Sequence, residues 1–231
     1  MGRLLMIAGR NLLKNKRRTL LLGGAIVVVT TLLILLGSVG NGINDTMMRA
    51  GTAMMTGHVN VGGFYKITSG QAAPLVTNAA QLKKDIQELV PDARLIINRD
   101  LGFGKIVSDS DTNQAALTAV DPKQETELRE VLQMVAGDFN NLSNEHTIML
   151  FEAQATRLNV TVGDKVTLSA PIMKGQNNSI DVTVGAVAKD LGLLSIMSAF
   201  VSPGTVHDLY ELADDTAGVY FIYLDNPDES E

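Results

Sequence analysis

The longest run of apolar positions lies near the N-terminus. Residues 19–44 contain no ionisable side chain, and residues 20–39 are nearly all Leu, Ile, Val, Gly and Ala. Twenty such residues, at a helical rise of about 1.5 Å each, span about 30 Å, which is the hydrocarbon thickness of a bilayer. A helix also satisfies its own backbone hydrogen bonds, which lipid cannot do. The pattern predicts a transmembrane helix over residues 19–44.

Two alternatives to a membrane anchor exist. A cleaved signal peptide would use Ser38-Val39-Gly40 as a weak cleavage site, and a soluble protein could bury the same segment as a core helix. The apolar region of a signal peptide is usually about 7–15 residues long, which is shorter than this run. The anchor is therefore the favoured interpretation.

A basic segment precedes the apolar run and predicts its orientation. Residues 1–18 contain no acid and six basic side chains, whereas the first acid after the run is Asp45. Positive charge stays on the cytoplasmic side of a span, so residues 1–18 are predicted inside and residues 45–231 outside the cytoplasm. The six candidate membrane-interface residues are Arg3, Arg10, Lys14, Lys16, Arg17 and Arg18.

The same basic segment has a helical spacing. Arg3, Arg10, Lys14 and Arg17 are seven, four and three positions apart, so a helix would carry them on one face. An amphipathic basic helix over residues 1–18 would lie among lipid headgroups and attract anionic lipid. The alternative is that these charges only set orientation and form no ordered helix.

Beyond residue 57, short strand-like and helix-like patterns alternate. Residues 58–61 predict a strand and residues 64–78 a loop. Asn78 is the expected N-cap of a helix whose apolar positions lie at Leu82, Ile86, Leu89 and Val90. Strands are expected at 94–98 and 104–107, with a bend at 102–104 between them, and at 114–120. Asp121-Pro122 predicts a helix that runs to about residue 136.

The second half of the body has similar patterns. We expect a strand at 148–151, a helix at 152–158, a turn at Gly163-Asp164, strands at 165–170 and 179–184, a helix at 205–212 and a strand at 219–224. Strands outnumber helices and many connections are short. The fold class is therefore predicted as α+β, with one N-terminal transmembrane helix and a mixed-sheet extracytoplasmic domain.

Composition narrows the function. The net charge is −6, and the basic segment 1–18, called the leader below, contributes +6, so residues 19–231 carry −12. A body with this excess of acidic residues is not expected to bind nucleic acid. The absence of cysteine excludes thiol nucleophiles and Cys-ligated metal. Walker A, HExxH and S-x-x-K patterns are absent. The chain is therefore expected to be no enzyme, with no catalytic, cofactor-binding or metal-ligating residue of its own.

Three weaker patterns have ordinary explanations. Asp109, Asp111 and Asn113 alternate as in a calcium loop, but the Gly and Glu that such a loop needs are missing. The histidines His58, His146 and His207 are far apart in the sequence. A group of methionines next to His58 offers soft ligands for Cu(I), although methionine also fills irregular apolar surface; its members are Met47, Met48, Met54 and Met55.

Five segments, in this order, resemble bacterial ABC-transporter permeases of the MacB/FtsX type, which include the lipoprotein-releasing permeases. Each segment alone is short, and together they extend in the family order from residue 10 to residue 168. They are residues 10–19 (RNLLKNKRRT), 57–61 (GHVNV), 89–93 (LVPDA), 119–122 (AVDP) and 151–168 (FEAQATRLNVTVGDKVTL). Leu158 and Gly163-Asp164 keep the family pattern, whereas Phe151 stands where the family usually has glycine.

The resemblance implies a non-catalytic permease subunit in a bacterial inner membrane. Members of the family have one span before a large periplasmic domain and three after it, so residues 45–231 would be an incomplete domain. ATP and Mg²⁺ would bind a separate cytoplasmic ABC ATPase, and a second permease subunit would complete a homo- or heterodimer in the bilayer. Lipoprotein release and substrate export both fit. The alternatives are a single-span anchored sensor or ligand-binding domain and a tethered envelope enzyme.

The predicted topology can be tested by labelling. Because the chain has no cysteine, the variant Ser110→Cys carries a unique thiol. A membrane-impermeant thiol reagent is expected to label it in intact cells, since residues 45–231 are predicted outside the cytoplasm. Labelling that occurs only after lysis would contradict this orientation.

Overall fold

The computed structural model describes residue 10 and residues 14–68, 71–172 and 176–224. The chain divides into two compact units, Met1–Met48 and Arg49–Glu231, which are described separately. The predicted amphipathic helix over residues 1–18 falls mostly outside the described residues, and Arg3 is among those outside.

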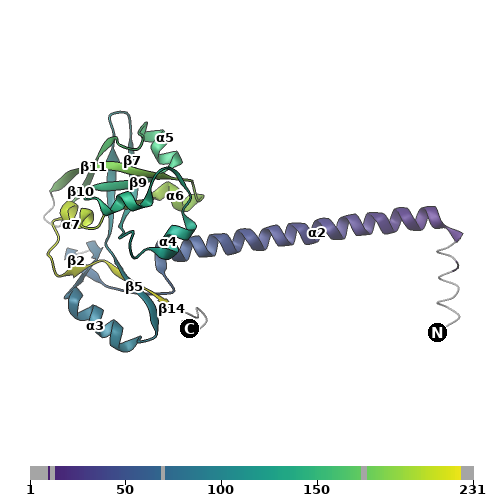
Figure 1. The fold of residues 1–231 in the computed structure, drawn as a ribbon, viewed down its shortest axis with the longest axis horizontal. Helices are drawn as coiled ribbons and strands as arrows, with labels where there is room; N and C mark the ends of the chain where they lie inside the picture. The colour runs from purple at the N-terminus through teal and green to yellow at the C-terminus, as the bar shows by residue number, and fades with distance from the viewer. Residues whose placement is uncertain (1–9, 11–13, 69–70, 173–175, 225–231) are drawn as a thin grey trace. The chain divides into compact units, whose positions relative to one another are not determined.

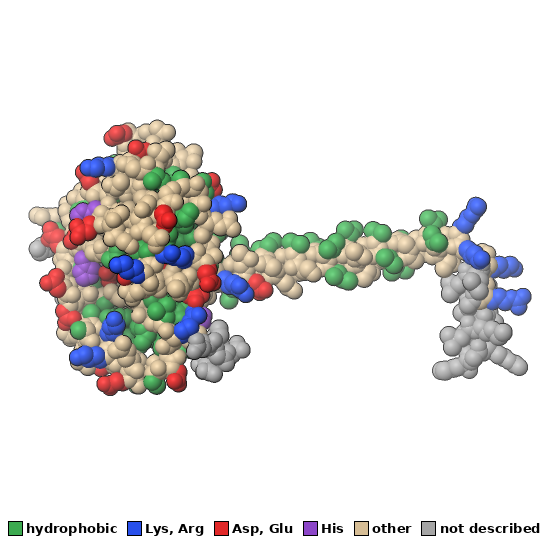
Figure 2. Space-filling view, in the orientation of Figure 1, with side chains coloured by type: hydrophobic (Ala, Val, Ile, Leu, Met, Phe, Trp, Pro, Cys, Tyr) green, Lys and Arg blue, Asp and Glu red, His purple; other side chains and the backbone are tan. Residues whose placement is uncertain are grey.

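The described residues of the first unit lie mainly in one long helix. Helix α2 (Lys16–Gly51) includes the whole predicted span and extends beyond it at both ends. It is long and apolar enough to cross a bilayer by length and composition, and its most apolar window has no buried residue. Figure 2 shows hydrophobic side chains along this helix and basic ones near its start. Its first turn carries the exposed side chains of Lys16, Arg17 and Arg18. Arg10 and Lys14, which precede the helix, are also exposed.

In the second unit, the end of α2 continues into a short π-helix. This element, η1 (Thr52–Thr56), follows α2 directly, and its Met54 is buried in the core of the body. Gly57 then takes φ +63°, and its α-carbon faces the side chain of Phe221 so closely that an added methyl group would lie 3.1 Å from it. Glycine therefore suits this turn for both conformation and space.

A three-stranded antiparallel sheet follows. Its strand order is β1 (Val59–Gly62), β14 (Val219–Leu224) and β5 (Ala93–Arg99). Helix α3 (Ala79–Leu89) lies on one face and packs Ile86 against Tyr220 and Ile222 (Figure 1). On the other face lie Ile97, Phe221 and Tyr223, all buried.

The larger sheet has seven strands and is mixed. Strands β7 and β12 pair in parallel, as do β9 and β11, and the other pairs are antiparallel. Because β10 also pairs with β11, six of the strands close on themselves, and β8 is added beside β11. The strands in sheet order are β10 (Lys165–Pro171), β6 (Leu101–Val107), β7 (Thr112–Ala119), β12 (Ser198–Val201), β9 (Thr147–Phe151), β11 (Asn177–Ala188) and β8 (Met134–Gly137).

Both faces of the larger sheet are covered. Ile148 and Leu150 of β9 join a cluster that includes helices α5 (Glu152–Leu158) and α7 (Thr205–Tyr210). The alternate residues Met149 and Phe151 join a second cluster with α4 (Thr126–Val131), the 3₁₀-helix η2 (Phe139–Ser143) and Met54 of η1. All five residues of β9 are therefore buried, as expected for a strand with both faces covered.

The predicted α+β class with a mixed sheet is confirmed, and so are most strands of the second half. Strand β9, helix α5 and strand β10 follow one another as expected. In β11, Val182 and Val184 face the core as the alternation predicts. The short strand at 58–61 and the strand at 219–224 are also present, as β1 and β14.

The predicted loop at 64–78 is wrong. This segment forms the hairpin of β2 (Phe64–Thr68) and β3 (Gln71–Pro74). It then forms β4 (Val76–Thr77), which pairs with β13 (Thr216–Ala217). The partner of β4 lies about 140 positions away in the chain, so no local pattern indicated it.

The predicted helix from residue 121 to 136 is also wrong in extent. Asp121 caps a single turn by accepting the backbone N–H of Lys123 at 3.0 Å, and the helix α4 covers only Thr126–Val131. Residues 134–137 are strand β8 instead, because they pair with β11. Pairing with a long neighbouring strand therefore overrides the local helix signal.

Two details around α3 and β6 also differ from the sequence prediction. Asn78 precedes α3 but has φ +61° and no capping hydrogen bond, and the Asp215 carboxylate accepts the Ala80 N–H at 3.2 Å instead. Leu89 was expected on the buried face of α3 but is 81% exposed. Residues 102–104, where a bend was expected, lie within strand β6, and the break between β5 and β6 falls at Asp100.

The Gly163 turn gives a stability prediction. Gly163 has φ +100° with open space where a side chain would begin, so the cost of a substitution comes from backbone strain alone. Gly163→Val is expected to lower the free energy of unfolding by about 1–3 kcal/mol, because a β-branched residue disfavours positive φ. Gly163→Asn should lose less, since Asn tolerates positive φ better. Calorimetry of the full chain in detergent measures both, and equal midpoints for Val and wild type would contradict the prediction.

Candidate functional site

The two sheets meet where β5 runs into β6. Arg99 is the last residue of β5, and Asp100 separates it from Leu101, the first residue of β6. Successive side chains of an extended chain point to opposite sides. Arg99 and Asp100 accordingly bond to different partners, and these two sets of contacts form the candidate site, which we call the sheet junction.

Arg99 makes a buried ion pair with Glu125. Its Nε donates to Glu125 Oε1 at 2.7 Å and its Nη2 to Oε2 at 2.5 Å, so the carboxylate is held by two parallel bonds. Both side chains have no exposed surface. Removing one partner of such a pair leaves an uncompensated buried charge and costs about 3–5 kcal/mol. Glu125 immediately precedes α4, so this pair links β5 to the segment that follows β7.

The third nitrogen of the Arg99 guanidinium reaches the helix that begins in the apolar segment. Nη1 donates to the backbone carbonyl of Met54 at 3.0 Å. The last carbonyls of a helix have no partner within the helix, and a cation is also favoured at this negative end of the helix dipole. The guanidinium carbon lies 4.7 Å from the centre of the Phe221 ring, which adds a cation–π contact from β14.

Asp100 makes the contacts on the opposite side. Its Oδ1 accepts the backbone N–H of Gly218 at 2.9 Å and the Asn98 amide at 3.3 Å. Its Oδ2 lies 3.3 Å from Nε2 of His207 on α7. The hydrogen bond to Asp100 raises the pKa of His207 above its usual value, and the nearby Asp208 and Asp214 add to this, although partial burial opposes it.

Gly218 lies in a second backbone segment that runs directly against Arg99 and Asp100. It lies between β13 and β14, and a methyl group on its α-carbon would lie 2.3 Å from the Arg99 carbonyl oxygen. Only glycine allows the two backbones to approach this closely. The segments that enter and leave the small sheet therefore touch at the sheet junction.

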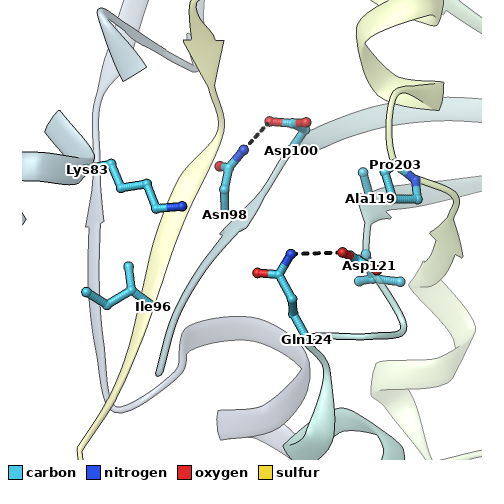
Figure 3. Close-up of a pocket in the computed structure, with 9 residues that line it drawn as sticks. Lys83, Ile96, Asn98, Asp100, Ala119, Asp121, Gln124 and Pro203 are labelled. Carbon is cyan, nitrogen blue, oxygen red and sulfur yellow. Dashed lines mark hydrogen bonds between the residues drawn. The ribbon is translucent and has the colours of Figure 1, made fainter. Parts of the chain in front are cut away.

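A cavity of about 230 Å³ opens beside Asp100 (Figure 3). In this view the Lys83 side chain extends toward Asn98, and Gln124 is hydrogen-bonded to Asp121 on the other wall. The cavity offers an ammonium group, amides and carboxylates, which could hold a small polar molecule; its lining has no nucleophile beside a base. The lining residues are Lys83, Ile96, Asn98, Asp100, Ala119, Val120, Asp121, Gln124 and Pro203.

The three histidines make their polar contacts with different residues. His58 Nδ1 accepts the Leu224 N–H at 3.1 Å and its ring packs against Tyr223, while His146 lies 3.0 Å from Asp208 at the surface. Of the methionine group, Met54 packs in the core, whereas Met47, Met48 and Met55 are exposed. Over residues 14–68, 71–172 and 176–224, no group of three or more His, Asp or Glu side chains is placed to hold a metal.

The possible calcium loop is a turn with its own bonds. Asp111 accepts the backbone N–H of Thr112 at 2.7 Å and pairs with Arg157 at 3.1 Å. The backbone hydrogen bond and then Arg157 lower the pKa of the Asp111 carboxyl. Asn113 belongs to strand β7, where it is largely buried.

Sequence reasoning did not find the sheet junction. Arg99 and Glu125 were not singled out, because neither belongs to a recognised sequence motif. The signal that existed was the alternation in β5: Arg99 shares the face of the apolar Ile97, so its side chain points into the protein.

No model of a known protein family and no curated protein matches the sequence. Among solved structures, the chain is similar to the extracellular domain of the noncanonic ABC-type transporter YknZ from Gram-positive bacteria, with 13% identity and a TM-score of 0.47 over 74% of this chain and 86% of that one. It is also similar to a domain assigned to a permease protein from Porphyromonas gingivalis, with 18% identity and a TM-score of 0.42 over 72% and 71%.

A third similar structure is the periplasmic region of MacB from Actinobacillus actinomycetemcomitans. The identity is 14% and the TM-score 0.43, over 62% of this chain and 64% of that one. All three structures are domains of transporters or permeases.

The contact between His207 and Asp100 predicts a pH-dependent stability. A pKa raised on folding gives stability that is fully present below the pKa of the unfolded chain, about 6.5, and is lost as the pH rises through the folded value. The difference in unfolding free energy between wild type and His207→Gln should therefore be largest below pH 6 and shrink toward pH 8. Chemical unfolding of both proteins across this range measures it. A difference that grows with pH would contradict the assignment.

Proposed function

We propose that the chain is a non-catalytic permease subunit of a bacterial ABC transporter. In this proposal residues 19–44 cross the inner membrane and the body lies in the periplasm. A separate cytoplasmic ATPase binds ATP and Mg²⁺ and moves the span, and a second permease subunit completes the transporter. The work done is the release of a lipoprotein or the export of a substrate.

The observation that carries the proposal is the order of the family-like motifs along the chain. The basic segment 10–19 leads into α2, and residues 57–61 join η1 to β1. Residues 89–93 connect α3 to β5, and residues 119–122 follow the end of β7. Residues 151–168 contain α5 and most of β10. The motifs after the span thus fall at junctions between elements of one folded body, where backbone conformation restricts sequence most.

The helix that begins in the span supports a role in transmitting motion. It continues without a break from Lys16 through the π-helical turn to Thr56. In this proposal, a movement of the span passes to the body through this helix. A ligand or nucleotide that shifts such an element must favour one of two arrangements.

The first test is purification of the full-length gene product from its native host. Co-purification of a cytoplasmic ATPase, and ATP hydrolysis by the complex but not by this subunit alone, is the expected result. A protein that purifies without an ATPase would favour the anchored sensor. ATP hydrolysis by this subunit alone would contradict the permease proposal.

The leader gives a second test in the same complex. Arg10, Lys14 and Arg17 would each gain about 1 kcal/mol near an anionic membrane surface. Replacing all three with Glu is expected to weaken the binding of residues 1–18 to the membrane surface. ATP turnover should then be uncoupled from cargo release, while the body stays folded. The matched control replaces the exposed body residues Lys84, Lys105 and Lys165 with Glu, which changes the net charge equally. Coupled turnover in the leader variant would contradict the role of the leader.

A further inference from the structure

We infer that Arg99 is a positioning residue that fixes the end of the long helix against both sheets of the body. Its guanidinium group holds Met54 of η1, Glu125 before α4 and the ring of Phe221 on β14 at the same time. The placement of η1 against the body, called the docking geometry below, is inferred from these contacts alone. Its consequence for transport rests on the proposed function.

The helix end needs a partner from elsewhere in the fold. The π-helical turn closes with a hydrogen bond from the Gly57 N–H to the Thr52 carbonyl at 2.8 Å. The next N–H, that of His58, donates to Ile222 on β14 instead. The helix therefore supplies no partner for the Met54 carbonyl, and Arg99 donates to it from β5.

A buried ion pair is a costly way to obtain stability. Well-packed apolar residues of similar volume often stabilise a core as well or better. What an apolar pair cannot supply is direction, because the planar guanidinium fixes the angles of all its bonds. The arrangement of Arg99 and Glu125 thus favours one placement of η1 among the placements that hydrophobic packing alone would allow.

The Arg99 guanidinium is connected to the two sheets through different residues. Glu125 belongs to the segment that follows β7 of the larger sheet, and Phe221 belongs to the small sheet. A displacement of η1 would therefore change the contacts of both sheets together. In the proposed transporter, Arg99 would therefore transmit a movement of the helix to both sheets.

A second ion pair provides a matched control. Arg94 and Glu127 join the same two elements, β5 and α4, but both side chains are partly exposed. Neither their ion pair nor their hydrogen bond includes η1. If a link between β5 and α4 were sufficient, loss of this exposed pair should have the same effect on η1 as loss of the buried one.

The test measures distances in the full chain in lipid nanodiscs. Because the sequence has no cysteine, spin labels can be placed in pairs at the exposed positions Met55 on η1, Ser110 on the larger sheet's turn and Lys84 on α3. Double electron–electron resonance then gives the distance distribution for each pair. The pair Ser110–Lys84 reports on the two sheets, and the pairs with Met55 report on the helix end.

The decisive variant replaces both buried charges, Arg99→Met with Glu125→Leu, so that no lone charge remains in the core. We expect a folded protein in which both distributions that include Met55 become at least twice as broad, while Ser110–Lys84 is unchanged. Arg94→Met with Glu127→Gln should change none of them. Unchanged Met55 distributions in the folded buried-pair variant would overturn the inference, as would equal broadening in the control.

The single variant Arg99→Lys covers the case in which the double variant does not fold. Lysine keeps the charge beside Glu125 but lacks the planar fork that also reaches Met54. The same broadening of the Met55 distributions is expected, and wild-type widths would overturn the inference.

The consequence for transport is measured separately in the purified complex with its ATPase. The buried-pair variant is expected to hydrolyse ATP at the wild-type rate while its cargo release falls at least tenfold. Broad Met55 distributions with normal coupling would overturn the role in transport and leave the docking geometry intact. If no ATPase co-purifies with wild type, the proposed function fails, whereas the distance result stands.

Discussion

A guanidinium group without access to water must find all its partners inside the protein, and Arg99 finds them on three segments that are distant in sequence. Its bonds to Met54 and Glu125 and its contact with Phe221 join the helix end, the segment that follows β7 of the larger sheet, and the small sheet. Hydrophobic packing fills the cores of both sheets, but it is non-directional. Arg99 is a directional group that contacts all three of these parts at once.

Local patterns predicted the elements whose partners lie nearby. The run from β9 through α5 to β10 has a buried strand, a helical period and a glycine turn in sequence, and all three are present. Prediction failed where a distant strand decided the conformation. Residues 134–137 carry a helix signal, yet they pair with β11, and residues 76–77 pair with a strand near residue 216. Such pairings are fixed by register across the fold, which one segment does not encode.

The candidate site was harder to predict than the fold. The sequence directed attention to histidines, methionines and acidic turns, because these carry recognised chemistry, and the structure gives each of them separate surroundings. Arg99 and Glu125 carry no motif, and 26 positions separate them in the chain. Their pairing arises only when β5 and the start of α4 are packed together, so it belongs to the tertiary structure.

Gly218 has a consequence for how this sequence tolerates variation. Its backbone does not lie in the left-handed region, so its own conformation places no demand on the side chain. The demand comes from the Arg99 carbonyl, against which even a methyl group would collide. In a set of homologous chains, the residue at this position would therefore covary with the separation of these two backbone segments: glycine would mark chains in which the segments touch, and a larger residue would mark chains in which they have moved apart.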